Sequence, residues 1–123
     1  MKKYLEQNDH PVIAVDVIIL NEKDQILLTK RNVEPQNGVW SLVGERIKVD
    51  DDSIEHAIMR GAKEECNIEV KPEYLVDVLA NPSIDPPADP RFYVVQVLYV
   101  ARFVDGTPTM TREVSEFAWK DLD

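Results

Sequence analysis

The feature that most constrains the fold is residues 11–20, a nearly continuous run of β-branched and other apolar residues that Asp16 interrupts. A short run of this kind predicts a strand whose two faces are both buried. The polar residues 21–24 then predict a turn, and the apolar residues within 25–30 predict a second strand that returns as a hairpin. The first part of the sequence therefore predicts a β-sheet.

One helical segment interrupts a series of further strand-like segments. Apolar residues recur at helical spacing in 54–66. Strands are predicted at 39–43 (ending at Gly44), at 68–70 and 74–80 around a turn at Pro72, at 91–104, and at 116–120. Four prolines within 81–90 predict an irregular loop. Strands on both sides of one central helix predict an α/β fold class with a mixed sheet.

Length and charge limit the classes of function. We expect a chain of 123 residues to form one domain. Its formal net charge of −9 disfavours binding to nucleic acid and to anionic membranes, because both attract basic surfaces. An acidic protein that binds a phosphate ligand needs a cation between its own carboxylates and the phosphate.

The sequence also predicts a cellular compartment. Cys66 is the only cysteine, so the chain forms no internal disulfide, as is typical of a reducing compartment. Residues 1–10 lack the apolar stretch of a signal peptide, and no run approaches the roughly 18 apolar residues of a membrane span. We therefore expect a cytoplasmic protein in which Cys66 is a small buried group.

The ends of the helix carry recognisable signals. Asp52 is a good N-cap residue, and Glu55 three positions later completes the pattern of a capping box. Asn67 tolerates the left-handed conformation in which helices commonly end. We therefore expect the helix to run from Asp52 to about Cys66.

An acidic residue lies within the apolar face of this helix. On a helical wheel Glu65 falls in the middle of that face and Glu64 at its edge, with the apolar positions being Ile54, Ala57, Ile58, Gly61 and Ala62. A carboxylate there is costly unless something offsets its charge. Three interpretations remain open: exposure to water at the last turn, an ion pair with Arg46 or Arg60, and binding of a cation.

Further oxygen donors are expected near the same helix. Gly44 precedes the loop, and Asp51 or Asp52 stands where the helix begins. Together with Glu64 and Glu65 they form one loop–helix unit with several oxygen ligands. Hard oxygen donors suit Mg²⁺ or Mn²⁺, which can join an acidic site to an anionic substrate.

This pattern resembles the signature of the Nudix hydrolases (MutT-like proteins), G-x5-E-x7-R-E-U-x-E-E-x-G-U, where U is a bulky aliphatic residue. Arg60, Glu64, Glu65 and Ile68 match in register, and Asp52 takes the place of the first glutamate. The segments 27–31, 38–42 and 116–119 also resemble the family. The resemblance implies a single Nudix domain over 1–123, with its box at about 44–68, folded as an α/β/α sandwich with a mixed sheet.

The resemblance also implies a metal site. Glu64 and Glu65 would be the main ligands of Mg²⁺ or Mn²⁺. The carbonyl of Gly44 and, through water, Asp52 would be further ligands. A plain helix cap is the alternative role of Asp52.

Other roles follow from the same resemblance. Arg60 would be a catalytic residue that orients Glu64 or a loop carboxylate, and Arg31 and Arg91 would contact substrate phosphates. The base would come from Glu64, Glu65 or a late carboxylate, Glu113 or Glu116, although simple exposure is the expected fate of Glu116 on its strand. Trp40 and Trp119 are expected in the core.

The implied reaction is attack of water on a diphosphate linked to another group, which releases a nucleoside monophosphate and a phosphorylated product. ADP-ribose and nucleotide sugars are substrates of this type, and the loop at 81–86 resembles that of small ADP-ribose pyrophosphatases. The chain also ends soon after Trp119, where relatives often continue into another helix. A sheet face would then be left for a partner subunit to cover, so a homodimer is one expected assembly.

Several departures from the signature leave alternatives open. Gly61 stands where the family has a glutamate, Asn67 where it has a glycine, and Val43-Gly44-Glu45 where it has Pro-Gly-Gly. Relatives that act on GDP-mannose also lack that glutamate. They use a late histidine as base, whereas this chain has only His10 and His56. The alternatives are a glycosyl hydrolase of that type and a nucleotide-binding module that does not cleave its ligand.

Overall fold

A computed structural model of the chain describes residues 11–32, 37–80, 94–111 and 114–122. These ranges contain six strands and one helix: β1 (Val12–Leu20), β2 (Ile26–Arg31), β3 (Trp40–Arg46), α1 (Ile54–Cys66), β4 (Glu69–Ala80), β5 (Val94–Asp105) and β6 (Val114–Lys120). The predicted element order and the predicted helix are therefore confirmed.

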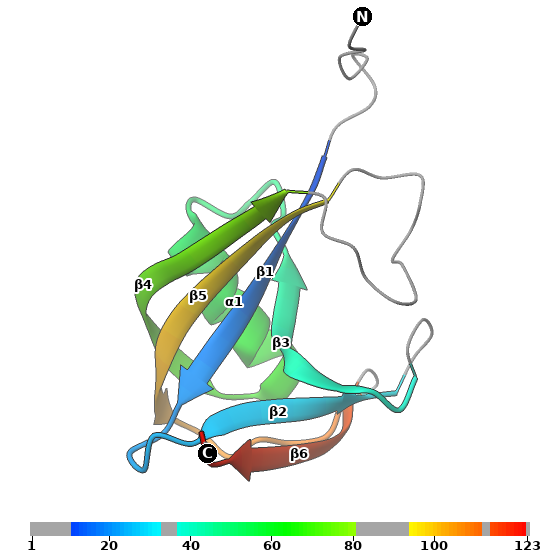
Figure 1. Cartoon of the computed structure of the whole chain (residues 1–123), viewed down its shortest axis with the longest axis vertical. Coiled ribbons are helices and arrows are strands. Elements are labelled where there is room, and N and C mark those ends of the chain that lie inside the picture. The colour runs from blue at the N-terminus through cyan, green and yellow to red at the C-terminus, as the bar shows by residue number, and fades with distance from the viewer. Residues whose placement is uncertain (1–10, 33–36, 81–93, 112–113, 123) are drawn as a thin grey trace, which may run out of the picture.

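The strands form one mixed sheet in the order β4-β5-β1-β3-β2-β6. β1 runs parallel to β5 and antiparallel to β3, and the other neighbours in this order are antiparallel. In Figure 1, α1 lies behind β4, β5 and β1, and β2 and β6 cross below them at a steep angle. The arrangement confirms the expected α/β class.

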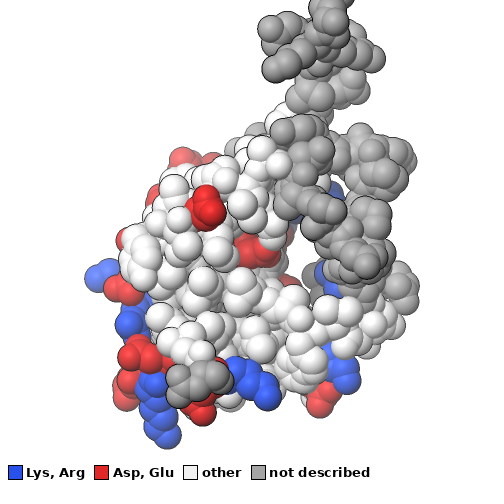
Figure 2. Space-filling model, viewed as in Figure 1, with Lys and Arg blue, Asp and Glu red and all other residues white. Residues whose placement is uncertain are grey.

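The hydrophobic core lies between α1 and the sheet. Side chains of β1 that alternate along the strand, Val15, Val17 and Ile19, pack there with Ile58 and Ala62 of the helix. The intervening residues of β1 are only half-buried, so the expectation of a strand buried on both faces was wrong. Among the described elements α1 covers one face of the sheet, and Figure 2 shows that the opposite face is largely uncharged.

The largest departures from the predicted strands are in β3 and β4, and β6 begins two residues earlier than predicted, at Val114. β3 continues past Gly44 to Arg46, because Gly44 still pairs with Asp16 of β1. β4 is one continuous strand through Pro72, where the expected turn is replaced by a shift of register against β5. β4 lies at an edge of the sheet, where a proline is tolerated because only one side of the strand is paired.

The two tryptophans have different environments. Trp119 packs against the core, and its ring meets that of Phe103 edge to face at a centroid distance of 5.6 Å. The prediction of a core position for Trp40 was wrong, since this residue is 42% exposed at the start of β3. Cys66 is buried, as expected. In the described part of the chain, no helix is long and apolar enough to cross a membrane.

Candidate functional site

The helix α1 begins one residue later than the sequence suggested. Ser53, not Asp52, is the N-cap, and its hydroxyl accepts a hydrogen bond of 3.0 Å from the backbone N–H of His56. Asp52 is exposed. Glu55 does not complete a capping box with it, because its carboxylate accepts a 2.8 Å hydrogen bond from the Tyr99 hydroxyl, which lowers the pKa of Glu55. At the other end, Asn67 adopts the expected left-handed conformation, with φ 59°.

Arg60 fastens the preceding loop to the helix. Its Nε donates to Oδ1 of Asp51 over 2.8 Å and its Nη2 donates to Oδ2 over 2.7 Å. The backbone N–H of Lys48 also donates to Oδ2, and the Asp51 side chain is shielded from solvent. These hydrogen bonds hold the pKa of Asp51 far below its usual range and raise the pKa of Arg60. The loop carboxylate that Arg60 orients is therefore Asp51.

The same guanidinium also reaches the helix and β3. Its Nη1 donates to Oε2 of Glu64 over 3.2 Å, the expected pair across one helical turn, and lies 3.5 Å from Oε2 of Glu45. Its Nη2 donates to the backbone carbonyl of Arg46. Arg60 thus gathers three carboxylates, from the loop, from α1 and from the end of β3.

Glu65 lies beside this group, on the inner side of the helix. Its Oε2 atom is buried. Burial, with a smaller contribution from the charge of Glu65, raises the pKa of the neighbouring Cys66 thiol to about 12. A thiol in this state is a poor nucleophile. Of the three interpretations of Glu65, exposure to water at the last turn therefore does not hold for its Oε2 atom.

Glu45 belongs to the carboxylate group around Arg60, and the sequence did not predict it. A Cβ atom placed on Gly61 would lie 2.9 Å from both Cβ and Cγ of Glu45 and 3.5 Å from its Oε2. The Glu45 side chain therefore occupies the space that a side chain at position 61 would need. The departure of Val43-Gly44-Glu45 from Pro-Gly-Gly was the signal that could have identified it.

Asp16, another acidic residue to which the sequence assigned no role, lies against Gly44 on the sheet face away from α1. A Cβ on Gly44 would approach Oδ1 of Asp16 to 2.7 Å, so the absence of a side chain at 44 makes room for this carboxylate. Gln96 donates a hydrogen bond to Asp16, and burial raises the pKa of Asp16 against the opposite effect of that bond. The signal in the sequence was a single acidic residue inside an apolar strand.

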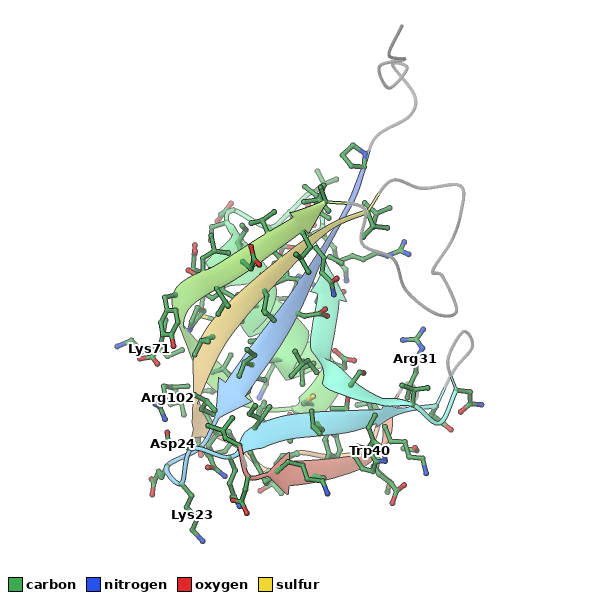
Figure 3. All side chains as sticks on the ribbon, in the orientation of Figure 1. Lys23, Asp24, Arg31, Trp40, Lys71 and Arg102 are labelled. Atoms are coloured by element: carbon green, nitrogen blue, oxygen red, sulfur yellow. The ribbon has the colours of Figure 1, made fainter. Side chains whose placement is uncertain are left out.

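Arg31 and Glu116 do not join this group. Arg31 ends β2 and projects away from Trp40 in Figure 3. Its neighbour Lys30 pairs with Trp40, five residues and hence roughly 17 Å along β3 from Glu45. Glu116 is exposed, as expected, and forms an ion pair of 3.1 Å with Lys30. The predicted phosphate contact Arg91, the candidate base Glu113 and the histidine His10 lie outside the described ranges.

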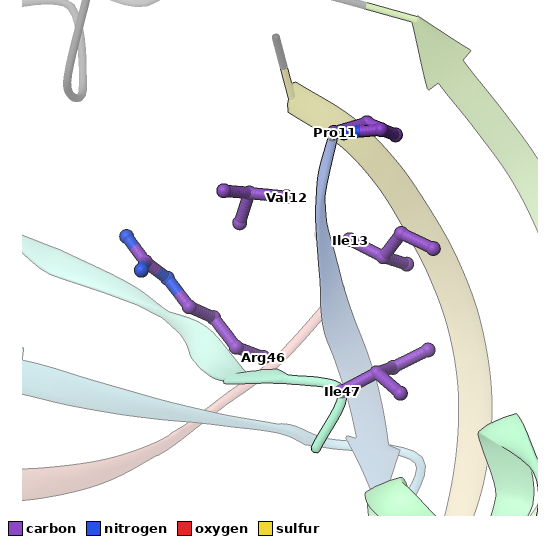
Figure 4. Close-up of a pocket in the computed structure, with 5 residues that line it drawn as sticks. All are labelled: Pro11, Val12, Ile13, Arg46 and Ile47. Carbon is purple, nitrogen blue, oxygen red and sulfur yellow. The ribbon is translucent and has the colours of Figure 1, made fainter. Parts of the chain in front are cut away.

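A small pocket lies where β1 begins and β3 ends. Its volume is about 240 Å³, and its lining residues are Pro11, Val12, Ile13, Arg46 and Ile47. Figure 4 shows the Arg46 side chain extending from the end of β3 beside Val12. Arg46 connects this pocket to the carboxylate group only through its backbone, whose carbonyl accepts a hydrogen bond from Arg60.

The donor set suits a hard divalent cation. No three side chains of His, Cys, Asp or Glu form a ready-made metal cluster among the residues that the structure describes. Glu45 and Glu64 nevertheless share Nη1 of Arg60, and Glu65 is the next residue on the helix. Mg²⁺ commonly takes only one or two protein carboxylates and completes its coordination with water and substrate phosphates. The residues present therefore fit Mg²⁺ or Mn²⁺ that binds together with a phosphate ligand.

Comparisons with known proteins identify chains similar to this one. The ADP-ribose pyrophosphatase of Methanocaldococcus jannaschii is 32% identical over 115 residues, which are 93% of this chain and 64% of that protein. The chain thus spans less than two thirds of that relative. The MutT protein of Methanosarcina mazei Go1 superposes with a TM-score of 0.75 at 23% identity, covering 95% of this chain and 81% of that one.

A third relative was solved with a ligand. The NUDIX domain of Shewanella oneidensis NrtR, complexed with ADP ribose, superposes with a TM-score of 0.71 at 26% identity, covering 93% of this chain and 75% of that one. The NUDIX domain family itself matches residues 10–123. A mixed sheet, a helix fastened to its loop by Arg60 and a family match over almost the whole sequence lead to one conclusion: the chain belongs to the NUDIX domain family.

Proposed function

We propose that this protein hydrolyses a nucleoside diphosphate linked to another group, with ADP-ribose as the leading substrate, and that it uses Mg²⁺ or Mn²⁺. The observation that carries the proposal is the grouping of carboxylates around Arg60 beside the buried Oε2 of Glu65. A relative named ADP-ribose pyrophosphatase and a similar domain solved with ADP ribose support the choice of substrate.

In this proposal some residues bind the cation and others hold those ligands in position. Glu64 and Glu65 are the main cation ligands in this proposal, with the Gly44 carbonyl and Asp52 as further donors. Arg60 is a positioning residue that keeps Glu64 in place while Asp51 anchors Arg60 to the loop. A bound cation would neutralise the diphosphate and lower the pKa of an attacking water. Arg31 and Arg91 are the proposed phosphate contacts, and Arg46 at the pocket is a further cation for this role.

The reaction is a displacement at phosphorus. A water oxygen bonds to one phosphorus of the diphosphate, and the bond from that phosphorus to the bridging oxygen breaks. Glu64 or Glu65 accepts the proton of the water, and the products are a nucleoside monophosphate and a phosphorylated second group. Since both products are anions, a site of net negative protein charge needs the cation throughout.

A nucleotide-binding module is the second candidate function. The observation that favours it is Gly61, where the family signature has a glutamate on the helix. A site with fewer carboxylates on the helix can still hold a nucleotide through its cation and pocket without cleaving it. Cleavage of the sugar bond, as in the GDP-mannose enzymes, is a further alternative. It would need a different base, because His56 is engaged with Asp51 at the start of α1.

The test is a hydrolysis assay with Mg²⁺ or Mn²⁺ on ADP-ribose, nucleotide sugars, dinucleoside polyphosphates and nucleoside triphosphates. The wild type is compared with Glu65→Gln and with Glu22→Gln, a control at an exposed turn. We expect Glu65→Gln to lose about 100-fold or more of the metal-dependent rate, because even outer partners of metal ligands are worth about 10- to 100-fold. The Glu22→Gln control should be unchanged.

Three outcomes would replace this proposal. Release of free sugar in place of a sugar phosphate would identify the glycosyl hydrolase. Equal rates in the wild type and Glu65→Gln would remove Glu65 from the reaction. No turnover on any substrate, together with a melting temperature that nucleotide and metal still raise, would identify the binding module.

A homodimer is the assembly that we propose. β4 forms one edge of the sheet, and several of its apolar side chains are about half exposed: Tyr74, Leu75, Val76, Val78 and Leu79. An edge strand offers unpaired backbone groups to another strand. In a two-fold dimer the same segment can pair with itself, so one apolar edge supplies both halves of the contact.

A further inference from the structure

We infer that Glu45 supplies, from the end of β3, the carboxylate that the Nudix signature places on the helix at position 61. In this inference Glu45 and Gly61 have exchanged residue types, and Glu45 helps to hold the divalent cation. The inference rests on the proposed function, since it concerns the cation site of that reaction.

The first argument is the register of the signature. Arg60 forms its paired hydrogen bonds with Asp51, so we align Asp51, in place of Asp52, with the first glutamate. Eight residues then separate it from Arg60, one more than the x7 of the signature. Counting back through the x5 segment from Asp51 leads to position 45, where the signature has glycine and this chain has glutamate. Directly after Arg60, the signature has glutamate and this chain has glycine. The two departures are therefore reciprocal.

The second argument is space. A Cβ at position 61 would lie 2.9 Å from Cβ and Cγ of Glu45, closer than nonbonded carbon atoms approach. Gly61 is buried in α1, and the side chain of Glu45 is only 24% exposed. The glutamate on the strand therefore needs the glycine on the helix.

The third argument is the position of the Glu45 carboxylate. Positions 61, 64 and 65 lie on one helix face, because residues three and four apart are neighbours. Glu45 covers position 61, and its Oε2 lies 3.5 Å from the Arg60 nitrogen that also binds Glu64. Its Oε1 accepts a 2.9 Å hydrogen bond from the backbone N–H of Arg46, which fixes the carboxylate. The Glu45 carboxylate therefore lies beside position 61, from which a helix glutamate would extend.

The test measures Mn²⁺ binding by electron paramagnetic resonance, with the metal alone as probe. We compare the wild type, Glu45→Gln, Gly61→Glu, the exchanged double variant Glu45→Gly/Gly61→Glu, and the Glu22→Gln control. We expect Glu45→Gln to weaken Mn²⁺ binding about 10-fold or more and the control to bind as the wild type does. The exchanged variant should bind within about threefold of the wild type, because it restores the carboxylate on the helix.

Melting temperatures of the same proteins give a second readout. Gly61→Glu alone should lower the melting temperature, because the new side chain meets Glu45. Adding Glu45→Gly should recover most of that loss. Wild-type affinity in Glu45→Gln, a wild type that binds no Mn²⁺, or an exchanged variant that binds no better than Glu45→Gln would overturn the inference.

These outcomes are separate from those of the proposed function. If Glu65→Gln abolishes hydrolysis while Glu45→Gln leaves Mn²⁺ binding intact, the hydrolase stands and this inference fails. If Mn²⁺ binding depends on Glu45 but no substrate is cleaved, the inference stands and the hydrolase fails.

Discussion

At the scale of single residues, the site depends on how one arginine is held. Arg60 forms two parallel hydrogen bonds with Asp51, a geometry that fixes both side chains better than a single contact does. Its remaining nitrogen then meets Glu64 and Glu45. Asp51 therefore controls the positions of carboxylates that it does not itself contact.

Replacing Asp51 by asparagine is expected to lower the melting temperature in a pH-dependent way. The pKa of Asp51 in the folded state lies below its ordinary value of 3.8, so its stabilising effect is present above about pH 4. That effect is lost as the pH falls toward the folded pKa. The difference in melting temperature between wild type and Asp51→Asn should be largest at pH 6–7 and should shrink below about pH 4.

A melting series from pH 3 to pH 7 measures this effect, with Asp52→Asn as the matched control. Asp52 is the exposed neighbour, so its replacement should leave the series unchanged. A constant difference across the whole pH range for Asp51→Asn would show that the lost hydrogen-bond geometry, not the charge, accounts for the destabilisation.

Individual contacts could be predicted only where the spacing within one element sets them. The pair of Arg60 and Glu64 follows from helical geometry, and the structure confirms it. Choosing Asp51 over Asp52 as the partner of Arg60 depends on the loop conformation, which three consecutive aspartates do not specify. Glu45 lies on β3 and Gly61 on α1, so the residue pattern within either element does not predict their contact.

At the scale of elements, α1 is held to the sheet by a narrow apolar stripe. Ala57, Ile58, Gly61, Ala62 and Cys66 are its buried residues, and the wheel had placed the first four on this face. The beginning of the helix was less predictable, because Asp52 and Ser53 are both good N-caps and only the actual hydrogen bond to His56 distinguishes them. The sequence predicts two segments in place of β4, because a proline such as Pro72 usually ends a strand in the interior of a sheet.

Truncating Ile58 to alanine is expected to destabilise the protein by about 2–5 kcal/mol, because it leaves a cavity between α1 and the sheet. The neighbouring Met59 is 44% exposed, so Met59→Ala should cost far less. Urea unfolding followed by circular dichroism measures both values. Equal losses would mean that the helix is not packed on the sheet through the Ile58 face.

At the scale of the whole molecule, the sequence predicted the fold class but not the strand order. Strand-like runs around one helix, together with the family resemblance, led to the mixed sheet that the structure shows. The order β4-β5-β1-β3-β2-β6 places β1 beside β5, more than 70 residues away, and local patterns do not encode such pairings. The largely uncharged face opposite α1 was likewise visible only in three dimensions (Figure 2).

The proposed dimer is tested at this scale. A lysine on an apolar edge strand opposes pairing with a second strand, so Val78→Lys should convert the dimer to a monomer. Val49→Lys is the matched control, because Val49 is fully exposed in the loop before α1. Sedimentation velocity gives the mass of each protein. A wild type that sediments as a monomer, or a Val78→Lys protein that remains a dimer, contradicts the proposed contact through β4.

The close approach of Gly61 to Glu45 has a consequence for the history of such a chain. Two glutamates would collide at this contact, and two glycines would remove the carboxylate that we propose as a cation ligand. Neither single step between the two arrangements is free of cost, so the two positions should covary among descendants of this lineage. The helix sequence of such a descendant, taken alone, would look as if it had lost a carboxylate. The carboxylate would instead stand on the neighbouring strand.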